Sequence, residues 1–192
     1  MRLKSPRIPP LPEAGWTAEQ REILAAITMG GAQVYNIFRT QIRLPEATRA
    51  FLAWGSYILS RRNDLPPRER EIVILRIGYL CRSGYEWAQH ECIGLQVGLT
   101  EVEIARIKAG PDAAGWSAAD KALLQATDEL HRDQFITTPT WNALAVHFSE
   151  SHRINLIYTT GQYTQVSMLL NTLGVQLDDD LSLDPDLAKP EA

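Results

Sequence analysis

Apolar residues recur at intervals of three and four positions along most of the chain, which is the spacing of one face of an α-helix. The run that begins at Pro67 shows this clearly, because Ile72, Leu75 and Tyr79 repeat at helical spacing. No segment shows a convincing alternation of apolar and polar residues, which is the pattern of a half-buried β-strand. The sequence therefore predicts an all-α fold, an antiparallel helical bundle with short connections.

Start and stop signals divide this pattern into eight predicted helices. Thr17 with Gln20 and Thr100 with Glu103 have the spacing of capping boxes, which mark helix starts. Gly174 follows a long apolar run and is predicted to end the last helix. The first helix is expected to follow Thr17, and the others to span residues 45–62, 67–81, 83–97, 100–109, 117–133, 138–148 and 151–173.

Composition indicates one globular domain between two less regular ends. The chain has 192 residues, of which 45% are hydrophobic and 22% are charged, so it can bury a core without disulfides or metals. Several prolines in residues 1–15 predict an extended N-terminal arm. Residues 178–192 begin with three aspartates and are predicted to form an acidic tail. We expect a single helical domain over residues 16–177.

Charge and polarity argue against several kinds of partner. The formal net charge is −4, so the chain lacks the basic surface that nucleic acids and anionic membranes attract. The stretch 154–177 is uncharged, but its many amide and hydroxyl side chains make it too polar for a membrane span. The N-terminus has no apolar signal-peptide core. We therefore expect a cytoplasmic protein without nucleic-acid or membrane partners.

The cysteines and histidines predict neither a redox pair nor a metal site. Cys81 and Cys92 are the complete thiol inventory, and their separation fits neither a C-x-x-C motif nor zinc ligation. We expect both to be small buried apolar residues. His131 and His152 have no carboxylate or thiol at metal-ligand spacing.

The segment after Ser83 places ionisable side chains on an apolar helix face. Glu86 and His90 share a stripe with two apolar residues, and a second apolar stripe predicts that the helix is buried on both sides. An imidazole one turn from a carboxylate can transfer protons, because the carboxylate fixes the tautomer and stabilises the imidazolium. Two structural explanations stay open: Ser83 and Glu86 also fit a capping box, and His90 also fits a hydrogen-bonded core histidine.

The preceding helix contributes a second candidate carboxylate. Glu71 shares a face with Leu75 and Gly78, and this glycine suggests close contact with a neighbouring helix. Glu71 would reach His90 if the two helices packed as an antiparallel pair, although an ion pair with an arginine explains it equally well. Arginines in the same segment, among them Arg82, are candidates for holding an anionic substrate.

A family resemblance is carried by the segment REREIVILRIGYLCRSGYEWAQHECIGLQVGLTEVEIARI. It resembles the core helical pair of the carboxymuconolactone decarboxylase / alkylhydroperoxidase D-like family, most strongly over residues 66–110. The motif is Tyr85-Glu86-Trp87-x-x-His90, preceded by Arg-x-x-Glu and followed by Gly-Leu-Thr. The resemblance implies an alkylhydroperoxidase D-like helical fold and a homo-oligomer, a trimer, dimer or hexamer.

The thiol branch of that family carries a glutamate and then C-x-x-C-x-x-x-H. When the last histidine is aligned on His90, Ser83 and Glu86 stand at the cysteine positions and Glu71 at the acidic position. The chain thus keeps the glutamate and the histidine and lacks both thiols, although peroxide reduction of that kind needs a thiolate nucleophile. Similarity to the decarboxylase branch instead implies His90 as general acid/base, oriented by Glu71 or Glu86.

These features predict an enzyme that performs cofactor-free general acid/base chemistry on a small organic acid or lactone, without a metal. The residues expected to bind the substrate are Ser83, Tyr85, Trp87, Arg82 and Tyr163. Two alternatives remain. One is a peroxidase-like redox protein, which the family name suggests and the missing thiols oppose. The other is a non-catalytic oligomeric protein that binds a small molecule.

Helix geometry and family resemblance disagree about Glu71. In a simple hairpin Glu71 lies about 18 Å from the turn and His90 about 10 Å, at about 1.5 Å per residue. A steep crossing angle, or an early end of the first helix near Leu80, would reduce this difference. We follow the resemblance and expect Glu71 and His90 to meet in a crevice between the two helices, with Glu86 within one turn of the imidazole.

Overall fold

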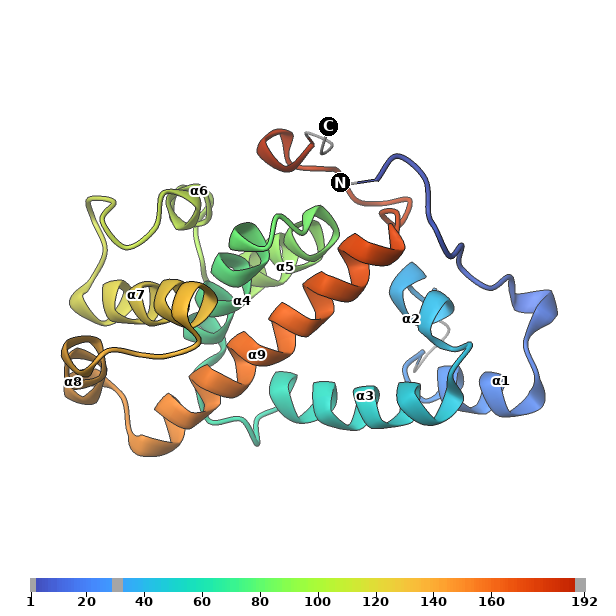
Figure 1. The fold of residues 1–192 in the computed structure, drawn as a ribbon, viewed down its shortest axis with the longest axis horizontal. Coiled ribbons are helices and arrows are strands. Elements are labelled where there is room, and N and C mark those ends of the chain that lie inside the picture. The colour runs from blue at the N-terminus through green and yellow to red at the C-terminus, as the bar shows by residue number, and fades with distance from the viewer. Residues whose placement is uncertain (1–2, 29–32, 189–192) are drawn as a thin grey trace.

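A computed structural model describes residues 3–28 and 33–188 of the chain. Within those ranges the regular elements are helices, with no strand, which confirms the all-α prediction (Figure 1). They are η1 (Glu13–Gly15), α1 (Ala18–Ala25), α2 (Asn36–Gln41), α3 (Pro45–Leu59), α4 (Pro67–Leu80), α5 (Gly84–Gln96), α6 (Glu101–Ala109), α7 (Ala118–Asp133), α8 (Thr138–His147), α9 (Glu150–Leu173) and η2 (Pro185–Leu187).

Helix α4 is the centre of the bundle. It packs against α5, α6, α7 and α9, and the long helix α9 crosses diagonally in front of it in Figure 1. Every residue from Arg70 to Gly78 is buried. A helix that is enclosed in this way must be apolar on most sides, and its charged groups need partners inside the protein. The partners of Glu71 and Arg76 therefore decide what α4 does.

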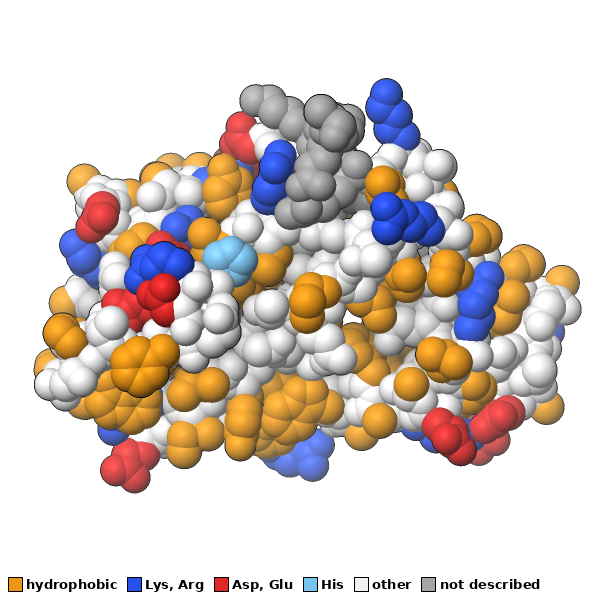
Figure 2. All heavy atoms as spheres, in the orientation of Figure 1, with side chains coloured by type: hydrophobic (Ala, Val, Ile, Leu, Met, Phe, Trp, Pro, Cys, Tyr) orange, Lys and Arg blue, Asp and Glu red, His pale blue; other side chains and the backbone are white. Residues whose placement is uncertain are grey.

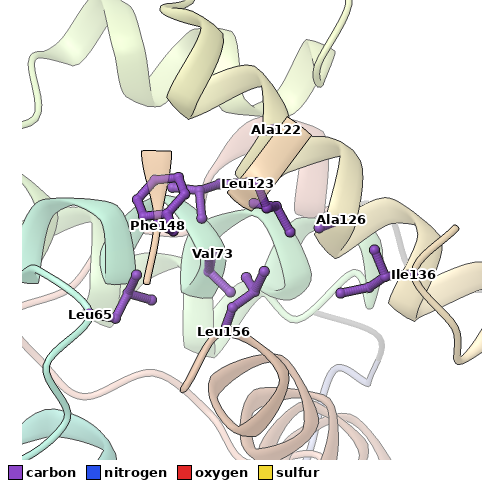
Figure 3. Packing of buried hydrophobic residues seen from close by; sticks show 9 residues of the cluster. Leu65, Val73, Ala122, Leu123, Ala126, Ile136, Phe148 and Leu156 are labelled. Carbon is purple, nitrogen blue, oxygen red and sulfur yellow. The ribbon is translucent and has the colours of Figure 1, made fainter. Parts of the chain in front are cut away.

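The largest core cluster lies between α4, α7 and α9. Figure 3 shows Val73 of α4, Leu123 and Ala126 of α7 and Leu156 of α9 pointing toward one another, with Phe148 beside them. Side chains packed at this density leave little room for movement. The cluster fixes α4 and α9, the two helices that carry Glu71 and Tyr163, relative to each other.

Arg76 ties α4 to α6 and α7. Its guanidinium donates to Asp128 Oδ1 at 2.6 Å from Nε and to Oδ2 at 2.8 Å from Nη2. Its Nη1 donates to the carbonyl oxygens of Ile107 and Lys108, each at 2.9 Å. These contacts engage the guanidinium in holding the three helices together.

Several predicted helix boundaries are confirmed, and one helix was missed. Both capping boxes are formed, at Thr17 and at Thr100. Gly174 ends α9 with a φ of 68°, in the left-handed region that glycine adopts without strain. Helix α3 ends at Leu59 rather than at residue 62. Helix α2 has only six residues and no side-chain cap, so the sequence carries no start signal for it.

Both ends of the described chain pack on the helices. In the N-terminal arm, the Leu11 amide donates to the carbonyl of Arg39 in α2. Beyond α9, Asp178 is buried and accepts hydrogen bonds from the Tyr85 hydroxyl, the Gln89 amide and the Asn36 backbone. The start of the predicted acidic tail is thus anchored to α2 and α5.

Part of the surface is apolar. Figure 2 shows hydrophobic side chains gathered along the lower edge, over the C-terminal half of α3. Trp54 and Leu59 of that half are exposed, as are Ile154, Ile157 and Tyr158 of α9. Trp54 packs edge-on against Tyr158, with 5.2 Å between the ring centroids. Among the described residues, no helix has the length and apolar character needed to cross a membrane.

Candidate active site

The connection between α4 and α5 sets the position of the site. Helix α4 ends at Leu80, and Arg82 turns the chain with a φ of 54°. The Ser83 amide then donates to the Gly78 carbonyl at 2.9 Å, so α5 folds back closely along α4. The Ser83 side chain makes no cap hydrogen bond, so the alternative that Ser83 and Glu86 form a capping box is wrong. Glu86 is free to face the neighbouring helix instead.

Two carboxylates enclose the imidazole of His90. His90 Nδ1 donates to Glu71 Oε2 at 2.7 Å, and His90 Nε2 lies 3.0 Å from Glu86 Oε1. All three side chains are buried. The predicted meeting of Glu71 and His90 is therefore a direct contact, and the early end of α4 reduces the mismatch of a simple hairpin. We call these residues the carboxylate–histidine cluster.

The cluster holds a proton firmly. Burial of the imidazole alone would lower its pKa, because desolvation disfavours the charged form. The negative charges of Glu71 and then Glu86 raise the pKa by more than burial lowers it, and the hydrogen bonds from His90 to these two carboxylates raise it further. The pKa of His90 is therefore raised to about 10. At neutral pH the imidazole is thus protonated and donates from both nitrogens.

Tyr163 of α9 covers the imidazole from the side. Its ring packs edge-on against the His90 ring, with 4.8 Å between centroids. Burial, followed by the negative charges of Glu86 and Glu71, raises the pKa of Tyr163 well above its usual value. Its hydroxyl therefore keeps its proton and remains a hydrogen-bond donor.

A cavity of about 340 Å³ opens beside the cluster, between α2, α3, α5 and α9. Glu86 and His90 line it, whereas Glu71 stands behind the imidazole and does not. The other lining residues are mostly apolar: Ile27, Tyr35, Ile37, Phe38, Phe51, Leu52, Gly55, Ser56, Ile58, Leu59, Tyr85, Gln89, Ile93, Gln162, Tyr163 and Val166. We call this space the site cavity.

The predicted substrate-binding residues divide into two groups. Tyr85 and Tyr163 line the site cavity, and Tyr85 donates to Asp178. Ser83, Trp87 and Arg82 do not line it, so nothing in the cavity supports the substrate-binding role predicted for them. Ser83 and Trp87 are buried in the core, and the Trp87 ring lies under the Lys108 ammonium at 5.4 Å, whereas Arg82 is exposed.

Several residues of the cavity walls escaped the sequence analysis. Phe38 belongs to the unpredicted helix α2, and Phe51 and Leu52 lie on α3, distant in sequence from the motif. The aspartate run at residue 178 looked like a solvated tail, so nothing indicated that Asp178 would be buried against Tyr85. These residues meet the motif only through contacts between segments that are distant in sequence, and local sequence patterns do not report such contacts.

Neither cysteine belongs to the site. Cys81 is half-buried and Cys92 is exposed, so the expectation that Cys92 is buried is wrong, and neither lines the site cavity. The second apolar stripe of α5 is buried near Tyr85 but exposed at Leu95. In the described part of the chain, no group of three or more His, Cys, Asp or Glu side chains is arranged to hold a metal ion.

The fold and the cluster together define an all-α protein with the alkylhydroperoxidase AhpD core fold and a buried carboxylate–histidine site. Residues 45–129 match the profile of the carboxymuconolactone decarboxylase family, and this range contains all three cluster residues. The segment that carries the site is therefore similar to that family. No curated protein matches the sequence significantly.

Three solved structures illustrate the likeness in fold. An uncharacterized peroxidase-related protein with the AhpD core, from Ralstonia eutropha JMP134, is 19% identical with a TM-score of 0.78, covering 90% of this chain and 94% of that one. A peroxidase-related protein from Silicibacter sp. TM1040 is 15% identical with a TM-score of 0.75, covering 93% and 92%. The debrominase Bmp8, in complex with 2,3,4-tribromopyrrole, is 12% identical with a TM-score of 0.72, covering 92% and 94%. At these identities the likeness concerns the fold.

Proposed function

We propose that the protein is a carboxymuconolactone decarboxylase-like enzyme that performs cofactor-free general acid/base chemistry on a small organic acid or lactone. The observation that carries this proposal is His90, held between two carboxylates on the wall of the site cavity. A buried imidazole in hydrogen-bond contact with carboxylates has the arrangement that proton transfer requires. The cavity beside it has room for a small organic molecule.

The two carboxylates take different roles in this proposal. Glu71 contacts Nδ1 from behind and is the residue that orients the imidazole. Glu86 and Nε2 face the cavity together, so this pair exchanges protons with the substrate. Glu86 removes a proton from carbon next to a carbonyl, while the imidazolium stabilises the charge that develops and returns a proton.

Solvent exchange tests this chemistry directly. Protein in D₂O is incubated with a panel of β-keto acids, ketones and lactones, and deuterium at the carbon next to the carbonyl is followed by NMR. We expect exchange with at least one compound, and His90→Gln to slow it by roughly 10²- to 10⁴-fold. The control is His147→Gln, an exposed histidine at the end of α8. Exchange that is no faster than in buffer, or that survives His90→Gln, contradicts the proposal.

The thiol alternative is tested by the same assay. Because neither cysteine lines the site cavity, the double variant Cys81→Ser/Cys92→Ser is expected to keep the exchange activity, and wild-type protein is expected not to reduce hydroperoxides with a thiol donor. Loss of turnover in the folded double variant would instead indicate a redox protein. Tight binding of a panel compound without any exchange would indicate a non-catalytic binding protein.

A further inference from the structure

The electrostatic character of the site cavity restricts what it can bind. Each imidazole nitrogen of His90 faces a carboxylate oxygen at 2.7 or 3.0 Å, so a proton must lie between each pair. Two protons shared by one imidazole and two carboxylates leave one net negative charge, wherever the protons sit. The buried cluster therefore repels an anion that enters beside it.

No cation of the described chain stands on the cavity wall to pair with an anionic ligand. None of the described lysines and arginines lines the site cavity. Arg70 is buried, but its Nη atoms donate to the carbonyls of Leu59 and Ser60 at the end of α3. Arg76 is occupied by Asp128 and two backbone carbonyls. A substrate carboxylate would lose its hydration here without gaining an ion pair, which is strongly unfavourable.

Two neutral polar groups remain available to a ligand. Gln162 is buried on the cavity wall, and no hydrogen bond joins its side-chain amide to another described residue. The hydroxyl of Tyr163 likewise has no described partner, and its ring touches His90. An amide N–H and a phenol O–H are both donors that fit a carbonyl oxygen. A carbonyl held by Tyr163 would place the adjacent carbon next to the Glu86–His90 pair.

The size and lining of the cavity complete the description. An apolar cavity of about 150 Å³ suffices to bind benzene, so the 340 Å³ here fits a substituted ring. Its walls are formed by residues such as Phe51, Leu52 and Val166. The net negative charge of the cluster would attract a ligand cation, so a cationic probe of the same shape is needed to separate attraction to this charge from recognition of a carbonyl.

We propose that the site cavity takes an uncharged cyclic carbonyl compound, bound through Gln162 and Tyr163, and excludes carboxylates. This inference rests on the proposed function and narrows it: the substrate is a neutral lactone or ketone rather than an organic acid. The reaction is then a proton shift within the carbonyl compound. One proton leaves the carbon next to the carbonyl for Glu86, and one returns from the imidazolium to a different position, so no carbon dioxide is released.

Matched ligands of one shape test the inference on the full chain. The probes are 4-methylacetophenone (neutral carbonyl), 4-methylbenzoate (anion), 4-methylbenzamidine (cation) and p-xylene (no polar group), titrated by calorimetry near neutral pH. We expect the ketone to bind at least about tenfold more tightly than the benzoate, because the anion loses its hydration without gaining an ion pair. Glu86→Gln removes a negative charge from the cluster. The ratio of the ketone affinity to the benzoate affinity is therefore expected to fall at least about threefold.

Gln162→Leu isolates the carbonyl contact. It is expected to lower the affinity for the ketone about fivefold or more. The affinity for p-xylene should stay the same, because the hydrocarbon accepts no hydrogen bond. Gln165→Leu, an exposed glutamine of the same helix, is the control and should change neither. Thermal unfolding confirms that each variant is folded before titration.

Each outcome has a defined meaning. Preference for the benzoate or the amidine overturns the inference, and so does a failure of all four probes to bind. Exchange activity limited to β-keto acids would overturn it as well while leaving the proposed acid/base function intact. Selective ketone binding without deuterium exchange on any compound would uphold the ligand class and reject the catalysis.

Discussion

At the scale of single residues, His90 has the most consequential environment in the described chain. Its imidazole is buried and contacts Glu71 on one nitrogen and Glu86 on the other. Its raised pKa means that the folded protein keeps a proton that the unfolded chain releases above about pH 6.5. The contacts with the two carboxylates therefore link the charge of His90 to folding.

The first prediction is a fall in stability between pH 7 and pH 9. His90 stabilises the fold fully below the pKa of the unfolded chain, near 6.5, and this contribution is lost as the pH rises toward the folded value of about 10. One extra bound proton in the native state makes the free energy of unfolding decline by up to about 1.4 kcal/mol per pH unit. Urea unfolding at several pH values measures this slope.

The variant His90→Gln provides the control for that measurement. It cannot bind the proton, so its stability should change much less with pH in this window, although it is lower at pH 7 because two carboxylates lose their partner. The buried tyrosines and Lys108 have raised pKa values and titrate above the window. Equal slopes for wild type and variant would show that the imidazole is not protonated in the folded state.

At the scale of helices, local sequence signals predicted most of the elements. The contacts between elements were harder to predict from the sequence. Capping residues Thr17 and Thr100 and the stop at Gly174 act within a few positions of themselves, so the sequence displays them directly. Helix α2 is short, uncapped and held by Asp178 from a distant segment, and no local pattern reports such a contact. The Glu71–His90 contact depends on the turn at Arg82, which helix periodicity does not specify.

The second prediction concerns Arg76, which joins α4 to α6 and α7. Arg76→Met removes the guanidinium and leaves Asp128 and the carbonyls of Ile107 and Lys108 without their donor. Breaking a buried ion pair in this way is expected to reduce the free energy of unfolding by about 3–5 kcal/mol. Arg132→Met is the matched control, because its pair with Asp133 is exposed and worth at most about 1 kcal/mol. Similar losses in both variants by denaturant unfolding would contradict this role.

At the scale of the whole molecule, the site cavity and the exposed apolar surface share the helices α3 and α9. The cavity uses inner residues such as Ile58 and Tyr163, whereas Trp54, Tyr158 and Ile154 point outward. The edge contact between Trp54 and Tyr158 joins the two helices on that outer side, and Trp54 also stacks on Tyr57 of its own helix. The same two helices, α3 and α9, therefore form the cavity wall on their inner side and the apolar surface on their outer side.

The third prediction is that this surface is covered by a second copy of the chain. Exposed aromatic and aliphatic residues that lie on neighbouring helices favour association, and identical subunits associate with closed symmetry. We expect a trimer, dimer or hexamer in light scattering at micromolar concentration, rather than the monomer mass of 21.5 kDa. Trp54→Glu combined with Tyr158→Glu places charge in the contact and should release monomers. Val146→Glu on α8, an exposed apolar residue away from α3, should leave the assembly unchanged. A wild-type monomer, or dissociation caused equally by Val146→Glu, would show that the α3–α9 surface is not the contact.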